Sequence, residues 1–250
     1  MSNAEPLLSP SLVVVCVIMA VAAGLVCRLV LKTSPWTVPV AGVRAAIQLA
    51  GVALVLAAAM MRLWSSVLVL AVMFVVATVT AARRSEADRG SRWLATALAT
   101  GMAAVIPLLL VSRVVPLTGV AIVPVFGIVL GGTMTAVAMA SRRALDTLRM
   151  RAGEVEAALS LGFSERDSRM EVIDRPLVDA LIPNLDQART AGLVTLPGAF
   201  VGVLLATGSA TQAAAVQVLV LISLLLSQAC GVAVTGELVA RGWITRSGPA

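Results

Sequence analysis

The chain has 250 residues, of which 59% are hydrophobic and 13% are charged, whereas soluble domains average about 45–50% and about 25%. This composition excludes an ordinary soluble protein, and without alternating apolar strands only helices remain as a way to cross a bilayer. The sequence has no histidine and no P-loop motif. This excludes His-based zinc sites, Ser–His catalysis and ATP binding by a P-loop of its own.

Seven windows are long and apolar enough to cross a hydrocarbon core of about 30 Å as helices. In chain order they are residues 12–31, 38–60, 64–82, 93–112, 119–140, 191–207 and 213–237. We therefore predict an all-α, polytopic helical membrane protein with about seven transmembrane helices in a single domain, residues 1–250. No positively charged stretch precedes the first window, so we expect it to be kept rather than cleaved as a signal peptide. Residues 1–4 are either native or a cloning remnant.

The positive charges predict how these helices are oriented. If the amino terminus is outside, sixteen of the nineteen Lys and Arg residues fall in inside regions, and only Arg62 and Arg113 lie outside. Cytoplasmic loops are enriched in Lys and Arg, so we expect a cytoplasmic carboxyl terminus and a multi-pass protein of the plasma (inner) membrane. The net charge of +6 then reflects topology, and we predict no nucleic-acid partner.

Residues 141–189, here called the charged segment, hold seventeen of the thirty-two charged residues. We expect the fifth span to continue into it as a helix that loosens at Gly153 and ends at Gly162, because glycine readily takes the left-handed conformation that closes a helix. Ser164 and Asp167 predict the cap of a second helix, which Pro176 should limit. The segment is thus predicted to be a cytoplasmic helix–turn–helix that docks a partner. The alternative is a solvated loop.

Polar positions and helix breaks within the spans are candidates for a translocation pathway. Arg44 and Gln48 lie one turn apart on one helix face, and a cation at that depth must be paired, hydrated or able to reach the membrane surface. A pathway role and simple snorkelling both remain open for Arg44. In the later spans, neutral oxygens and freed backbone carbonyls give the candidates Thr133, Thr195, Pro197 and Gly198. No recognised metal-ligand spacing is present, so a metal site is not predicted.

Glu156-Ala157-Ala158, followed by Leu161 and Gly162, resembles the EAA loop of ABC-transporter permeases. That loop is the coupling helix that docks into a cleft of the ATPase subunit. The usual Ile-x-Leu-Pro ending is shifted here to residues 173–176 and lacks the leucine.

A more specific resemblance, to the iron-export ABC permease family and its plant aluminium-tolerance relatives, extends from about residue 38 to residue 237. It rests on the stretches 44–49, 159–162, 180–183 and 196–198.

This resemblance implies a permease subunit, present in two copies that work with two separate cytoplasmic ABC ATPase chains. It makes the residues of the EAA-like loop ATPase-coupling residues, and it implies neither an enzyme nor a bound cofactor. The implied activity is export of iron or another metal ion, with import as the alternative direction. Two other functions stay open: ABC export of a small organic solute such as a nucleotide sugar, and an ATP-independent channel or scaffold.

Overall fold

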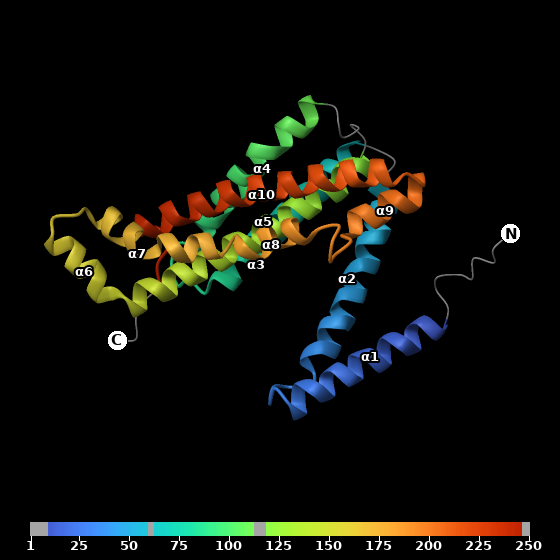
Figure 1. The fold of residues 1–250 in the computed structure, drawn as a ribbon, viewed down its shortest axis with the longest axis horizontal. Coiled ribbons are helices and arrows are strands. Elements are labelled where there is room, and N and C mark those ends of the chain that lie inside the picture. The colour runs from blue at the N-terminus through green and yellow to red at the C-terminus, as the bar shows by residue number, and fades with distance from the viewer. Residues whose placement is uncertain (1–9, 60–62, 113–118, 247–250) are drawn as a thin grey trace. The chain divides into compact units, whose positions relative to one another are not determined.

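The computed structural model describes residues 10–59, 63–112 and 119–246, which fold into α-helices without a strand (Figure 1). The all-α prediction is therefore confirmed for the described residues. The helices fall into two compact units, Met1–Met61 and Arg62–Ala250. The first contains α1 (Pro10–Leu29) and α2 (Thr37–Ala59). The second contains α3 (Leu63–Ser85), η1 (Ser91–Trp93), α4 (Leu94–Val111), α5 (Gly119–Met150), α6 (Ala152–Ser160), α7 (Glu165–Asp179), α8 (Ile182–Thr190), α9 (Gly198–Thr207) and α10 (Ala210–Ala240).

Five helices of the described chain are long and apolar enough to cross a membrane: α1, α3, α4 together with η1, α5 and α10. Two shorter apolar helices match the second and sixth predicted spans. Of the positions singled out in the sequence, residues 1–4, Arg62 and Arg113 lie outside the described residues.

The sixth predicted span, residues 191–207, is helical only in its second part. Its helix, α9, has 10 residues, about 15 Å, which is half of a hydrocarbon core. The preceding residues form a turn in which the Gly192 N–H donates to the Thr195 carbonyl at 2.8 Å. Pro197 precedes α9, and proline both lacks an N–H and disfavours a helical conformation in the residue before it.

In the first unit, α1 and α2 pack as a helical hairpin. The connecting turn is held by hydrogen bonds from the Thr33 amide to the Cys27 carbonyl at 3.0 Å and from the Thr37 hydroxyl to the Ser34 carbonyl at 2.9 Å. Trp36 lies directly before α2 and lines the same hollow as the predicted pathway residues Arg44 and Gln48.

In the second unit, α10 packs against both α4 and α5. Helix α3 also packs against α5. Leu98, Leu130 and Val239 are among the fully buried side chains of this core. A hydrogen bond of 2.7 Å between the buried hydroxyls of Thr133 and Ser227 crosses this core. Apolar packing together with a hydroxyl pair between helices is typical of helix packing in membranes.

Helix α5 is longer than a membrane requires. Its 32 residues span about 48 Å, against about 30 Å for a hydrocarbon core. The expected continuation of the fifth span is therefore present, but the predicted loosening at Gly153 is wrong in position. The helix breaks at Arg151, whose backbone leaves the helical region (φ −113°, ψ 31°), while Gly153 lies inside α6.

The prediction that Pro176 limits the second helix is also wrong, because α7 continues to Asp179. A proline inside a helix removes the hydrogen bond to the carbonyl four residues earlier, here that of Val172. The guanidinium of Arg151 lies 3.5 Å from this carbonyl oxygen and donates to it. The orphaned acceptor therefore has a partner from the break between α5 and α6.

Candidate functional site: a protruding helix–turn–helix

Helix α6 ends in a glycine turn, as the sequence predicted. Gly162 has φ +91°, a conformation that side chains with a Cβ rarely adopt. Its amide donates to the Leu159 carbonyl at 3.0 Å, and the Phe163 amide donates to the Ala158 carbonyl at 3.2 Å. These two bonds form a Schellman motif, which satisfies the last carbonyls of the helix.

Two residues later, Ser164 caps α7, also as predicted. Its hydroxyl accepts from the Asp167 amide at 3.1 Å and donates to the Asp167 carboxylate at 2.7 Å. The Ser164 hydroxyl, and then Arg166, lower the pKa of the Asp167 carboxyl below its ordinary value of 3.8. These interactions favour the charged carboxylate, so their contribution to stability is present above the ordinary pKa and is lost as the pH falls through the lowered one.

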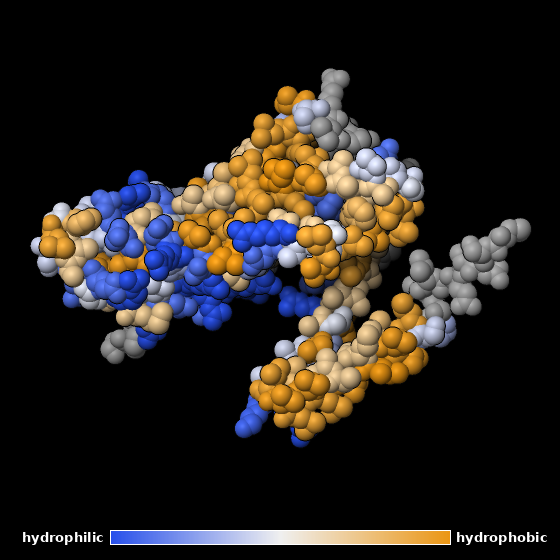
Figure 2. Space-filling view, in the orientation of Figure 1, coloured by the Kyte–Doolittle hydropathy of each residue, from blue (hydrophilic) through white to orange (hydrophobic). Residues whose placement is uncertain are grey.

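The coupling residues proposed from the sequence lie on the outside of this helix–turn–helix. Glu156 and Ala157 are exposed and Ala158 is half-buried. Leu161 is 79% exposed and Phe163 is 51% exposed. Figure 2 shows apolar surface next to hydrophilic surface at the end of the second unit where Figure 1 places α6. Two exposed apolar residues on a rigid turn form a surface suited to contact with another protein.

The opposite face of α7 is anchored to the long helices. Val172, Ile173 and Leu177 are buried, and α7 packs against both α5 and α10. Arg166 of α7 pairs with Glu237 of α10 at 2.6 Å. The Arg169 guanidinium also donates to the Ala240 carbonyl at the end of α10, at 3.4 Å. A displacement of the turn would therefore act on the ends of α5 and α10.

Sequence reasoning missed this anchoring. The sequence places Glu237 only at the end of the last predicted span, and it gives no local signal that singles out Arg166 or Phe163 as functional. The sequence does contain a signal for such an ion pair. It has an acid near the end of a span and arginines in a nearby amphipathic helix. The sequence does not show which arginine pairs with Glu237, because Arg166 and Glu237 are 71 positions apart.

The pathway candidates belong to both units, and their surroundings are described unit by unit. In the first unit, Arg44 and Gln48 line the same shallow hollow of about 400 Å³, whose other walls are apolar and include Trp36. The two residues thus share a face of α2, as predicted, and Arg44 is exposed there.

In the second unit, Thr195, Pro197 and Gly198 surround the start of α9. The amide of Phe200, in its first turn, donates at 3.1 Å to the side-chain oxygen of the buried Gln217 in α10. Gln217 was not predicted. It supplies one of the partners that the first amides of a helix lack.

Thr133 lies elsewhere in the second unit. Its hydroxyl bonds to the Val129 carbonyl and to Ser227, both at 2.7 Å, and Ser227 is about 15 Å along α10 from Gln217. Thr133 therefore contributes to helix packing in this conformation. Within the described residues, no group of three or more Cys, Asp or Glu side chains is arranged to hold a metal ion.

These features define the class: a polytopic helical membrane protein whose long helices carry an anchored, exposed helix–turn–helix. The chain belongs to the Uncharacterised protein family (UPF0014), whose model matches residues 9–244. It is similar to the UPF0014 membrane protein STAR2 of rice (Oryza sativa subsp. japonica), with 35% identity over 150 residues, or 60% of this chain and 53% of that protein.

Two further relatives extend the comparison. Protein ALUMINUM SENSITIVE 3 of Arabidopsis thaliana is 31% identical over 157 residues, 62% of this chain and 58% of its own length. The Probable iron export permease protein FetB of Escherichia coli (strain K12) is 27% identical over 129 residues, 52% of this chain and 50% of its own length. The matched part therefore spans little more than half of these relatives. The resemblance predicted from the sequence is confirmed, and no solved structure matches the chain.

Proposed function

We propose that this chain is the membrane-spanning subunit of an ABC transporter and exports iron or another metal ion. A separate cytoplasmic ATPase would dock on α6, Gly162 and the start of α7. The observation that carries the proposal is this exposed turn, which is rigidly closed on one side and anchored to α5 and α10 on the other. The choice of iron rests on the name of the Escherichia coli relative.

The mechanism follows from that arrangement. Closure of the ATPase on ATP would push the turn that holds Leu161 and Phe163. Because α7 is joined to α10 by the Arg166–Glu237 pair and packs on α5, the push would tilt both long helices. We propose that this tilt switches access between the two sides of a single permease domain, residues 1–250, which works as a pair of copies with two ATPase chains.

Two matched glycine variants test the docking surface. A Cβ at Gly162 or at Gly153 would meet nothing within 4 Å, but only Gly162 has a positive φ. Gly162→Val should therefore strain the turn by roughly 1–3 kcal/mol, whereas Gly153→Val keeps a helical backbone. We expect Gly162→Val to insert normally but to retain little of a co-expressed ABC ATPase on purification, and Gly153→Val to retain it as the wild type does.

The same purification can contradict the proposal. If Gly162→Val recovers as much ATPase as the wild type, with the same stimulation of ATP hydrolysis, the turn is not the docking surface. If the wild type itself recovers no ATPase, the channel or scaffold alternative is favoured.

A further inference from the structure

Within the second unit, α8 lies alongside the middle of α10, and two contacts set its level. On one side of α8, the Leu177 side chain of α7 lies 2.4 Å from where a Cβ at Gly236 of α10 would be. On the other side, the Phe200 amide of α9 donates to the Gln217 side chain of α10 at 3.1 Å. From Gln217 to Gly236 the helix rises about 28 Å. Helix α8 comes between the two contacts in the chain and midway along α10 in space (Figure 1).

This stretch of α10 is apolar over the width of a membrane. Helix α10 has no charged residue before Glu237, and it is long and apolar enough to form a span. The distance of about 28 Å between the two contacts nearly equals a hydrocarbon core of about 30 Å. Just beyond the helix, Trp243 lies against Trp93 with ring centroids 5.0 Å apart, and tryptophan is enriched where a span meets water. Residues beside this stretch therefore lie at membrane depth.

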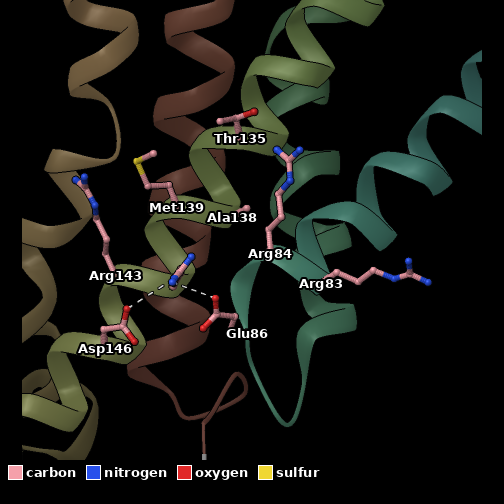
Figure 3. A pocket seen from close by; sticks show the side chains of 9 residues that line it. Arg83, Arg84, Glu86, Thr135, Ala138, Met139, Arg143 and Asp146 are labelled. Atoms are coloured by element: carbon pink, nitrogen blue, oxygen red, sulfur yellow. Dashed lines mark ion pairs between the residues drawn. The ribbon is translucent and has the colours of Figure 1, made fainter. Parts of the chain in front are cut away.

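Helix α5 places the predicted cytoplasmic edge of the membrane at the same level. Two contacts show that α5 and α10 run in the same direction: Thr133 with Ser227, and Val137 with Gly231. In this register Arg142, the first charged residue of α5, comes level with Gly236. Figure 3 shows other charged side chains of α3 and α5 that gather around this level: Arg83, Arg84, Glu86, Arg143 and Asp146. Helix α8 lies further towards the middle of the membrane than these charges.

Three polar side chains of α8 are exposed at that depth. They are Asp186, Gln187 and Arg189, whereas Leu185 and Ala188 are half-buried. Arg189 pairs with Asp186 at 3.3 Å, and these side chains are 74% and 57% exposed. Figure 2 shows hydrophilic surface where Figure 1 places α8, next to hydrophobic surface. Charges at membrane depth almost always face a protein interior or a water-filled cavity, and the short side chain of Asp186 cannot reach the membrane surface as a long one does.

This hydrophilic face continues in one direction only. Towards the cytoplasmic edge, α7 exposes the charged residues Asp174, Arg175 and Asp179. In the other direction, the large exposed side chains of the turn and of α9 are apolar: Leu193, Val194, Leu196 and Leu205. The change from hydrophilic to apolar surface occurs at the turn of residues 191–197. Water is therefore expected beside α8, and apolar surroundings beside α9.

We propose that α8 forms one wall of a water-filled vestibule, which opens to the cytoplasm and ends near the middle of the membrane at the turn of residues 191–197. The sixth span would then begin at α8, whereas the sequence predicts it from residue 191 only. Helices α8 and α9 together rise about 28 Å, which is close to a whole hydrocarbon core. Because three polar side chains share the face, its hydration does not depend on any one of them.

The test measures thiol labelling in membranes, in a background without the three native cysteines. Gln187→Cys is compared with Leu226→Cys, because Leu226 is exposed on α10 at about the same level when the chain is spread evenly between the two contacts. A membrane-impermeant maleimide is added to inside-out vesicles. Thiols react as thiolates, which apolar surroundings disfavour, so we expect Gln187→Cys to react about 10-fold faster than Leu226→Cys. Ser164→Cys gives the rate in water, and labelling after denaturation in SDS gives the total thiol.

Three results would overturn the proposal. Equally slow labelling of Gln187→Cys and Leu226→Cys would show that water does not reach α8. Fast labelling of both would place this level of α10 outside the membrane. Faster labelling of Gln187→Cys in intact cells than in inside-out vesicles would place the opening on the other side. The experiment uses no ATPase, ATP or metal ion, so its outcome is independent of the proposed transport activity.

Discussion

Arg44 is a charged residue in an apolar helix, so its role depends on what surrounds its side chain. On α2 its side chain lies beside Gln48 in a hollow with apolar walls, and in the described residues it makes no ion pair. A charged side chain at the centre of a spanning helix costs about 2.5–3.5 kcal/mol on insertion scales. Arg44 lies seven residues after Thr37, the first residue of α2, and a cation at that depth is paired, hydrated, near a pathway or able to reach the membrane surface. Its exposure on α2 leaves it free to meet water, substrate or another helix.

The first prediction at this scale is therefore that Arg44→Ala inserts and folds but transports poorly. The matched control is Arg28→Ala, which removes an exposed cation from the last turn of α1 and should transport normally. Metal efflux from cells that express equal amounts of each variant is the measurement. Normal efflux by Arg44→Ala would support snorkelling to the membrane surface as the explanation for this residue.

At the scale of elements, α7 is the connection between the exposed turn and the long helices. Its buried face packs on α5 and α10, and its Arg166 pairs with Glu237. The pair is partly exposed, and exposed ion pairs contribute little to stability. We therefore expect it to matter less for folding than for the transmission of movement from α7 to α10.

A second prediction follows for Glu237→Gln. The variant should bind the ATPase and hydrolyse ATP, yet transport per ATP should fall by about 10-fold, within the usual range of coupling energies. The matched control is Asp186→Asn, which breaks the 3.3 Å pair with Arg189 inside α8 and leaves both the docking surface and the contact of α7 with α10 intact. Equal transport-to-hydrolysis ratios for the two variants would show that the Arg166–Glu237 pair does not carry the movement.

The elements also show what the sequence could and could not predict. The Gly162 turn and the Ser164 cap were predicted because their hydrogen bonds join residues three to five positions apart. The continuation of α7 past Pro176 was missed because the compensating donor, Arg151, lies 21 positions from Val172. The buried partner of α9, Gln217, was missed for the same reason. Helix ends can be predicted from residues nearby in the sequence. The tolerance of Pro176 within α7 and the buried partner of α9 depend on side chains that are distant in the sequence.

At the scale of the whole molecule, a cytoplasmic ATPase can reach the exposed turn only if the charged segment lies in the cytoplasm. Sixteen inside cations against two outside predict that the charged segment is cytoplasmic. A third prediction is that Ser164→Cys, placed on the exposed start of α7, reacts with an impermeant thiol reagent only after the cells are opened. The three native cysteines are replaced by alanine in the same background. Rapid labelling in intact cells would place the turn outside and remove any access for a cytoplasmic ATPase.

We propose that ATP hydrolysed by a separate chain drives an ion through this one, and that Gly162 is needed to link hydrolysis to transport. The most direct measurement is iron movement in proteoliposomes that contain the protein with its ABC ATPase. We predict transport that requires both the ATPase and ATP, is largely lost in Gly162→Val and is kept in Gly153→Val. Iron movement at the same rate without the ATPase or without ATP, or full activity of Gly162→Val, would contradict the claim.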